Sequence, residues 1–212
     1  VNIATDGNKG LYAYGGLRMG GEAFYGLDLT SRTSPSMLFT ITPTSTGFDR
    51  MGQIWSKPTK AKIKKNSTDT GTDVLVFGGG YDMCYEYEKF QVGVTDIDLG
   101  ACSGIDNAQG NAVYIINAED GSLIWSASSN GSPSTTVGAM TNSVVAGITT
   151  LDRDNDGFMD HIYFADLGGQ LFRADFTNAG FETQPDIGST PTGTPTKTTA
   201  FANTRVTRIL SG

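Results

Sequence analysis

A short acidic run late in the sequence has the residue types and spacing of a metal-binding loop. In LDRDNDGFMD, Asp152, Asp154 and Asp156 occupy alternate positions, Gly157 follows them, and Asp160 ends the run. Alternate carboxylates in a tightly turned segment converge on one point when a glycine permits the chain to reverse, and Ca²⁺ takes about six to eight oxygen ligands. The run therefore predicts a calcium site, the alternative being a solvated acidic turn.

The surrounding residues narrow the kind of metal site. The backbone carbonyl of Phe158 is expected to supply a further oxygen ligand. An EF-hand needs a bidentate Glu at the twelfth loop position, where this chain has Tyr163, so a helix-loop-helix site is excluded. Magnesium is disfavoured because it demands strict octahedral geometry, and zinc usually needs several nitrogen or sulfur ligands.

The only histidine, His161, directly follows the acidic loop. A residue at the start of a strand is more often a surface or packing residue than a ligand or a base. No motif around it supplies the partners of a Ser-His-Asp or Cys-His site. The chain has Asp and Glu residues that could form the paired carboxylates of a glycosidase. Its one dense acidic cluster, however, is interpreted as a metal-binding site. We therefore predict that the chain is not an enzyme.

The elements that must position this loop are β-hairpins. Residues 112–127 and 162–176 each consist of an apolar or alternating run, a tight turn containing glycine, and a second run, and residues 22–30 repeat half of this pattern. Further strands are expected at residues 11–14, 37–41, 73–77, 144–149 and 204–210. No stretch of helical period exceeds two turns, so the sequence predicts an all-β fold.

Hairpins that recur between irregular loops indicate a β-propeller, in which small antiparallel sheets are arranged around an axis. Blades of about 40 to 50 residues give roughly four or five in this chain. We expect residues 1–212 to form a single propeller-like domain, either a small complete ring or a fragment cut from a larger precursor. The Thr/Pro/Gly-rich residues 188–199 are expected to form a loop between strands.

Charge and hydropathy restrict the partners. The net charge of -7 disfavours nucleic acid as a default partner. No apolar stretch approaches the roughly 20 residues that span a bilayer. The sequence opens at Val1 without a charged and apolar leader, and we expect a signal peptide upstream of it.

Two cysteines, Cys84 and Cys102, lie in a segment rich in Gly, Asp and Tyr. This arrangement suits one disulfide closing a surface loop in an oxidising compartment, although cysteine count alone leaves two separate thiols open. We predict the disulfide, within an inserted loop over residues 81–110.

Four aromatic residues accompany the first cysteine: Tyr81, Tyr85, Tyr87 and Phe90. Aromatic side chains that a disulfide holds on the surface would make a recognition site. Packing of the loop onto the domain is an equally good interpretation.

Five lysines lie in KPTKAKIKK, residues 57–65. If the segment is extended, Lys60, Lys62 and Lys64 point to one face. Lysines on an edge strand prevent unwanted strand pairing, which is the preferred interpretation. Contact with DNA or another polyanion is the alternative.

The order of these motifs resembles the C-terminal propeller domain of the PilY family, the tip-associated adhesins and assembly factors of bacterial type IV pili. The similarity runs through residues 15–30, 74–82, 112–124 and 151–176. The last segment is highly specific, since it resembles the family's D-x-D-x-D-G-x-x-D element and the hairpin after it. The others are weak alone. The insertion with two cysteines departs from the family pattern, and the Arg-Gly-Asp tripeptide of some members is absent.

The resemblance implies that Asp152, Asp154, Asp156, the Phe158 carbonyl and Asp160 bind calcium that tunes pilus extension against retraction. It further implies passage through the periplasm to the pilus tip, where the partners are minor pilins and host or abiotic surfaces. Pilus biogenesis, adhesion, twitching motility and DNA uptake are the implied roles. Residues 118–125 also resemble a tryptophan-docking repeat, so a periplasmic quinoprotein dehydrogenase that binds pyrroloquinoline quinone is the alternative.

Overall fold

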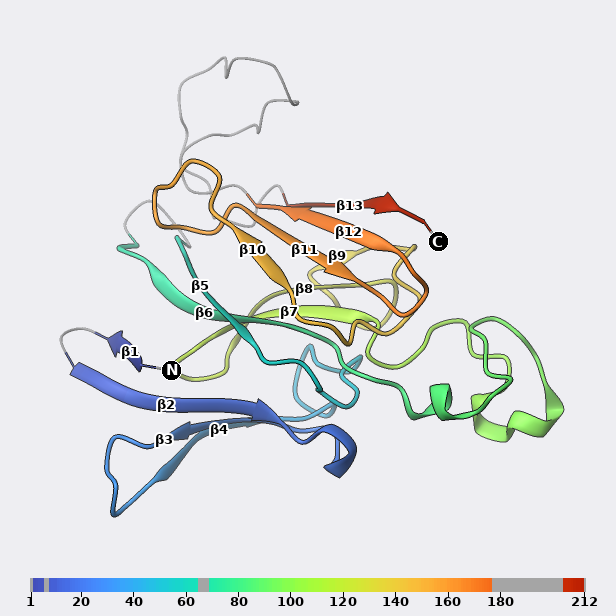
Figure 1. Ribbon diagram of the computed structural model, residues 1–212, viewed down its shortest axis with the longest axis horizontal. Coiled ribbons are helices and arrows are strands. Elements are labelled where there is room, and N and C mark those ends of the chain that lie inside the picture. The colour runs from blue at the N-terminus through green and yellow to red at the C-terminus, as the bar shows by residue number, and fades with distance from the viewer. Residues whose placement is uncertain (1, 6–7, 65–68, 177–203, 212) are drawn as a thin grey trace.

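The computed structural model describes residues 2–5, 8–64, 69–176 and 204–211, and within them the regular structure is almost entirely β (Figure 1). The described residues contain three short 3₁₀ helices and no α-helix; the first, η1, is Arg18–Gly20. The all-β prediction is confirmed. The expected loop at residues 188–199 lies outside the described residues.

The strands form three sheets that follow one another along the chain. The first contains β1 (Asn2–Thr5), β2 (Asn8–Gly16), β3 (Phe24–Asp28) and β4 (Ser36–Ile41). The second contains β5 (Thr59–Ile63), β6 (Thr72–Gly78), β7 (Ala112–Asn117), β8 (Leu123–Ser128) and β9 (Thr135–Thr136). The third contains β10 (Thr149–Leu151), β11 (His161–Ala165), β12 (Leu171–Asp175) and β13 (Arg205–Leu210).

Within each sheet the strands pair in chain order and antiparallel, except that the short β9 is parallel to β8. The hairpins expected over residues 112–127 and 162–176 are β7–β8 and β11–β12. The turn of the first hairpin is closed by the Gly121 N–H, which donates to the Asn117 carbonyl over 3.0 Å. Gly121 has φ 72°, a conformation that glycine adopts without steric cost.

The middle sheet is buried on both faces, which explains the unbroken apolar runs of its two central strands. In β6, Val74 and Val76 face the third sheet, whereas Leu75 and Phe77 face the first. Side chains alternate between the two faces of a strand, so a run that is apolar at every position fits a strand covered on both sides.

Each interface of the middle sheet contains packed aromatic rings. Toward the first sheet, the rings of Phe24 and Phe77 stack with their centroids 4.5 Å apart. Toward the third sheet, Trp125 meets Phe176 edge to face at 5.0 Å. These two cores join the three sheets into one body and hold the third sheet, which carries the acidic loop.

Two sequence expectations differ from the structure. Residues 144–148 form bends and irregular chain, and β10 begins only at Thr149; in that stretch the backbone bonds to other loops, as when the Gly80 N–H donates to the Val144 carbonyl over 3.0 Å. The described residues contain three sheets, against the four or five blades expected, because the long β6–β7 connection consumes chain without adding a strand. These residues form no closed ring, so the propeller stays a prediction.

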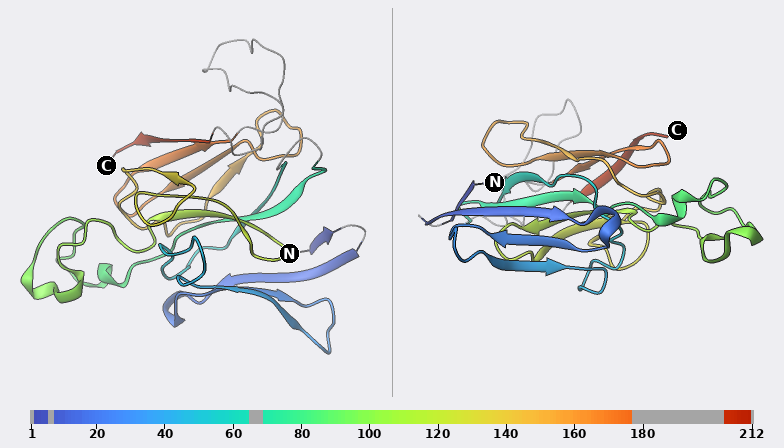
Figure 2. Two further views of the ribbon diagram at one scale, coloured as in Figure 1. Left: turned by 180° about the vertical axis from the view of Figure 1, so that it is seen from behind. Right: turned by 60° about the horizontal axis from the view of Figure 1, so that its bottom comes forward.

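The β6–β7 connection projects from one side of the molecule (Figures 1 and 2). It contains η2 (Met83–Glu86) and η3 (Ile97–Cys102) and is closed by a disulfide between Cys84 and Cys102, whose Cα atoms lie 5.6 Å apart. The predicted disulfide is therefore present. At its base, Gly80 and Gly110 bring their backbones so close that a Cβ on either would collide with main-chain atoms.

Candidate metal centre

The acidic loop connects β10 to β11 and lies at the end of the molecule opposite the disulfide-closed connection (Figures 1 and 2). Its ends are fixed by the sheet, because Leu151 pairs with His161 across the antiparallel β10–β11 ladder. The Asp160 N–H also donates to the Leu151 carbonyl over 2.9 Å. The loop is thus held on a rigid element, while its tip is exposed.

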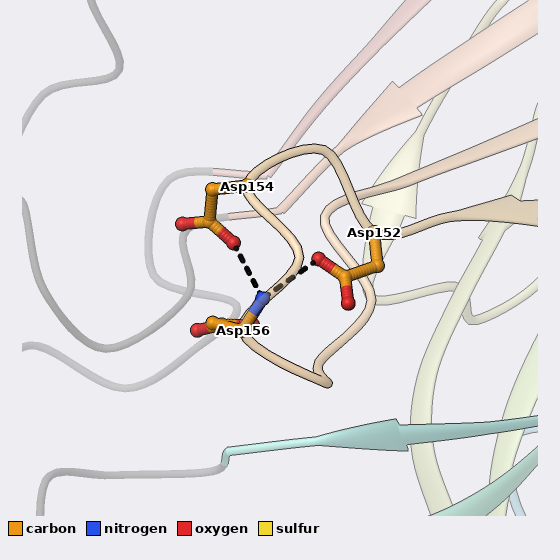
Figure 3. A group of neighbouring side chains, drawn as sticks. All are labelled: Asp152, Asp154 and Asp156. Atoms are coloured by element: carbon orange, nitrogen blue, oxygen red, sulfur yellow. Dashed lines mark hydrogen bonds between the residues drawn. The ribbon is translucent and has the colours of Figure 1, made fainter.

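Three of the predicted ligands converge at this tip. Oxygen atoms of Asp152, Asp154 and Asp156 all lie within 4.8 Å of one another (Figure 3). The Asp156 N–H donates to Oδ1 of Asp152 and to Oδ1 of Asp154, each over 3.2 Å. The backbone itself thus gathers the carboxylates, as the alternate spacing predicts.

The reversal of the chain depends on two residues in the left-handed region. Asn155 has φ 62° and Gly157 has φ 89°. Asparagine tolerates this region better than most residues, and glycine enters it freely. The turn directs the Gly157 N–H to Oδ2 of Asp152 over 2.8 Å. The predicted role of Gly157 is confirmed, whereas Asn155 carried no separate expectation although asparagine is a signal for this conformation.

The structure places Asp160 apart from the group of three. It is buried, and its Oδ2 accepts a hydrogen bond from the Arg153 N–H over 2.6 Å. Burial raises the pKa of its carboxyl, the negative charges of Asp154 and Asp156 raise it further, and the Arg153 N–H and His161 oppose the shift. This carboxyl clamps the loop's two halves together, and its role as a ligand stays a prediction.

Phe158 connects the loop to the second sheet. Its N–H donates to Oδ1 of Asp156 over 2.8 Å, and Lys64 Nζ lies 4.6 Å from the centroid of its ring. The next residue, Met159, donates its N–H to the Lys62 carbonyl over 2.8 Å. The loop therefore contacts the end of β5 as well as its own sheet, and the Phe158 carbonyl remains a predicted ligand.

His161 is a buried, paired residue. Its Nδ1 lies 2.8 Å from Oδ1 of Asp175. Asp175 also meets Arg173 Nε at 2.7 Å and Arg205 Nη2 at 3.2 Å. Sequence reasoning grouped His161 with surface and packing residues and missed this network. The sequence contained only an indirect signal for this network. A hairpin brings the outer ends of its two strands together, and here His161 lies opposite Asp175.

Lys60 and Lys62 lie on an edge strand, as expected, and Lys64 directly follows it. β5 is the outermost strand of the second sheet, with Lys60 and Lys62 exposed on one face. Lys60 Nζ lies 3.5 Å from Oδ2 of Asp73 on the neighbouring strand, and Lys64 is drawn to the Phe158 ring. Two of the three charges thus have partners within the chain, which weakens the case for a DNA-binding stripe.

The aromatic residues of the inserted connection divide between packing and exposure. Tyr81 and Tyr85 lie 5.7 Å apart between centroids, and Tyr85 meets Phe90 at 5.0 Å. Trp55 reaches Tyr81 from the body at 6.2 Å. Only Tyr87 among the four is mainly exposed, at 52%. Packing therefore accounts for three of them, and one is available for recognition.

The chemistry of the loop follows from its charge. Three carboxylates gathered at an exposed tip repel one another, and a hard cation relieves this repulsion while accepting their oxygens. The chain's one histidine is engaged with Asp175, and both cysteines are in the disulfide, so the donors at the tip are oxygens alone. The donor set fits Ca²⁺ better than zinc or another metal that prefers nitrogen or sulfur.

Comparison with solved structures gives an informative similarity. No protein-family model matches the chain, and no curated protein matches its sequence. Among solved structures, the Pseudomonas aeruginosa PilY1 C-terminal domain aligns with 82% of this chain at 24% identity and a TM-score of 0.56. The chain shares the fold of that domain. The resemblance expected from the sequence is thus confirmed at the level of the fold, and the match spans 28% of the PilY1 chain. None of the described helices is long and apolar enough to cross a membrane.

Proposed function

We propose that the chain is a calcium-binding β-propeller module of a type IV pilus tip adhesin and assembly factor. The observation that carries the proposal is the convergence of the Asp152, Asp154 and Asp156 carboxylates on a strand-connecting loop. The fold shared with the PilY1 C-terminal domain supports the placement at a pilus. Three successive sheets of mainly antiparallel strands, two of them four-stranded, resemble the blades of a propeller.

Asp152, Asp154 and Asp156 would hold the ion, with the Phe158 carbonyl and Asp160 completing the set. When bound, calcium supplies positive charge that neutralises the carboxylates and ties the two halves of the loop together. The protein positions the ligands through the backbone N–H groups of Asp156 and Gly157, which already orient the Asp152 side chain. Calcium would thus act as a conformational clamp at this end of the third sheet.

The resemblance set out from the sequence supports the cellular role. In this proposal the protein crosses the periplasm, reaches the pilus tip, contacts minor pilins there and presents a surface to host or abiotic material. Pilus biogenesis and twitching motility would depend on it. DNA uptake has the weakest support, because Lys60 and Lys64 are engaged with Asp73 and Phe158.

A non-enzymatic role is part of the proposal. His161 is 5% exposed and paired with Asp175, which leaves no accessible histidine to act as a base. The dehydrogenase alternative rests on the segment ending at Trp125, which is buried and donates its Nε1–H to Thr135 Oγ1 over 3.0 Å. Quinone-dependent absorbance changes on adding pyrroloquinoline quinone, calcium and an alcohol would favour the enzyme; we expect none.

Calorimetry tests the metal site directly. Calcium added to chelator-treated protein should bind with a Kd of roughly 10⁻⁴ to 10⁻⁶ M and raise the melting temperature. Asp152→Ala should abolish both effects and leave the fold intact, because the cores of the sheets lie elsewhere. Glu119→Gln, an exposed acid on another turn, is the matched control and should bind as the parent does. If calcium produces no heat of binding and the melting temperature is the same in chelator and in calcium, the calcium site is refuted.

The pilus assignment needs its own test. Asp152→Ala in the full-length protein should alter piliation or twitching while the protein itself remains present at normal levels. Calcium binding in calorimetry without any change in piliation or twitching would keep the metal site and overturn the pilus role, so the two parts of the proposal fail separately.

A further inference from the structure

The negative charge of the protein is concentrated in the disulfide-closed connection between β6 and β7. Residues 81–110, here called the insertion, carry six acidic residues and one basic residue, a net charge of -5 out of -7 for the whole chain. The acidic residues are Asp82, Glu86, Glu88, Asp96, Asp98 and Asp106. The insertion therefore presents an acidic surface on a molecule whose remainder is nearly neutral.

The same insertion exposes large apolar side chains. Ile97 is 92% exposed, Met83 62%, Tyr87 52% and Val94 42%. Isolated apolar residues on a surface need no explanation, but several on one small projecting element indicate an interaction site. The insertion that carries them projects away from the three sheets (Figure 2).

The insertion also contains apolar residues that are buried. Phe90 and Leu99 are buried, at 8% and 7% exposure, and Phe90 packs edge to face on Tyr85. The Tyr85 hydroxyl in turn donates to Oδ1 of Asn142 in the body over 3.2 Å. The insertion thus buries some of its apolar residues and still leaves Ile97 in solvent.

Covalent and hydrogen bonds hold this surface in one shape. The disulfide joins η2 to the end of η3, and Asp82 accepts from the Cys84 N–H over 2.8 Å and from the Gln109 N–H over 2.7 Å, so it ties both ends of the insertion. Midway, the Gly93 N–H donates to the Ile105 carbonyl over 2.7 Å. A surface ordered before binding loses less conformational entropy when a partner docks.

Carboxylates flank the most exposed apolar residue on both sides along the chain. Ile97 lies between Asp96 and Asp98, and the only base of the insertion, Lys89, approaches these two acids at 4.0 and 3.9 Å. The Asp98 side chain remains 76% exposed, so this ion pair is weak and open to exchange. Glu88 is exposed as well.

We propose that the insertion docks a protein partner whose surface carries an apolar patch surrounded by Lys and Arg. Burial of Ile97 and Tyr87 would supply most of the binding free energy, and the surrounding acids would steer the partner and set its orientation. Anionic partners such as nucleic acid and acidic lipid are repelled by the same charge. A symmetric pairing of two insertions is disfavoured, because it places two surfaces of charge -5 against each other.

Labelled amphipathic peptides test this chemistry by fluorescence anisotropy. The probe is a helical peptide of leucine and lysine; the comparison peptides replace every lysine by glutamate, or every leucine by serine. The leucine-lysine peptide should bind at least tenfold more tightly than either. Ile97→Ser and Asp98→Asn should each weaken its binding, the first about tenfold. Met19→Ser, at a 74% exposed position outside the insertion, and Glu119→Gln, an exposed acid outside the insertion, should stay within twofold of the parent.

Several outcomes would overturn the proposal. Equal binding of the serine-lysine peptide would mean simple attraction between polyelectrolytes, and equal weakening by Met19→Ser would mean that the insertion is not the site. Sedimentation showing a dimer that Ile97→Ser dissolves would assign the surface to a second copy. Because Ile97 is exposed to solvent, Ile97→Ser should have the same melting temperature as the parent. As a second measurement, reducing the disulfide should weaken binding of the leucine-lysine peptide while the sheets remain folded.

Discussion

The Nδ1 atom of His161 lies 2.8 Å from Oδ1 of Asp175, and the two residues are direct partners across β11 and β12. Asp175 also accepts from Arg173 on its own strand and from Arg205 on β13. One buried carboxylate thus connects three strands at the end of the sheet where the acidic loop enters β11. Since burial of an unpaired charge is costly, each of these partners helps to keep it ionised.

Replacing Asp175 by Asn should destabilise the protein strongly. The change removes the charge that Arg173, Arg205 and His161 share, and hydrogen bonds to charged groups contribute about 1.5 to 3 kcal/mol. We expect a loss of about 2 to 3 kcal/mol in the free energy of unfolding at neutral pH, measured by urea denaturation. Glu119→Gln, which removes an exposed acid of the β7–β8 turn, is the control and should lie within about 0.5 kcal/mol of the parent.

The pH dependence of this loss has a defined sign. Burial alone would raise the pKa of Asp175, but hydrogen bonds from Arg173 and Arg205 and the charges of Arg173 and His161 outweigh it. They hold the pKa below its ordinary value of 3.8. The folded protein therefore binds fewer protons here than the unfolded chain, and the stabilisation is present above that ordinary value. It should disappear as pH falls through the lower pKa of the folded state. A difference between parent and Asp175→Asn that stays constant down to strong acid would contradict this account.

Asp154→Asn should separate repulsion from metal binding. In chelator, the variant removes one of three gathered negative charges and should gain about 0.5 kcal/mol, within the range for exposed charges. Asn retains the Oδ1 that accepts from the Asp156 N–H, so the loop keeps its shape. The variant should bind calcium more weakly than the parent does, and calcium should raise its melting temperature by less. Scanning calorimetry measures the rise in melting temperature that calcium causes. An equal rise in the parent and the variant would show that Asp154 is not a ligand.

Much of the fold follows from local sequence signals. The β7–β8 and β11–β12 hairpins were predictable because each combines apolar runs with a turn that contains glycine. The strand expected over residues 144–149 was wrong for the opposite reason: its apolar residues Val144 and Ile148 are buried from irregular chain, and periodicity cannot tell a buried loop from a strand. β1 and β9 carry too few residues for any pattern to reveal them.

The convergence of three carboxylates in the acidic loop was predictable, but the environment of Asp160 was not. Alternate spacing and Gly157 are local signals, and the structure gathers Asp152, Asp154 and Asp156 accordingly. Asp160 has the spacing of a ligand, yet burial and the Arg153 N–H engage its carboxylate within the protein. That outcome depends on how the loop packs on the sheet, which no spacing rule encodes.

The disulfide should stabilise the insertion and through it the domain. Cys84 and Cys102 are 18 residues apart, and closing a loop of that length contributes roughly 3 kcal/mol in the chain-entropy account. The double variant Cys84→Ser and Cys102→Ser should lose about that much in urea denaturation. Ala101→Ser, which places a serine at an exposed position beside Cys102 and leaves the bond intact, is the control. Two free thiols by mass spectrometry of protein made in an oxidising compartment would refute the bond itself.

Calcium should also slow hydrogen exchange where the acidic loop meets the neighbouring sheet. The Met159 N–H donates to the Lys62 carbonyl over 2.8 Å, and the Asp160 N–H donates to Leu151 over 2.9 Å, so ordering the loop restricts the openings that expose both amides. We expect exchange at these two amides to slow by about tenfold or more in calcium, because the ligand stabilises only the closed loop.

The Leu29 N–H, bonded to the Leu11 carbonyl in the first sheet, serves as the reference amide and should slow less. In Asp152→Ala the slowing at Met159 should vanish. If calcium binds by calorimetry and the Met159 and Asp160 amides still exchange as they do in chelator, the ion does not clamp the loop to β5, and its effect on the protein must arise elsewhere.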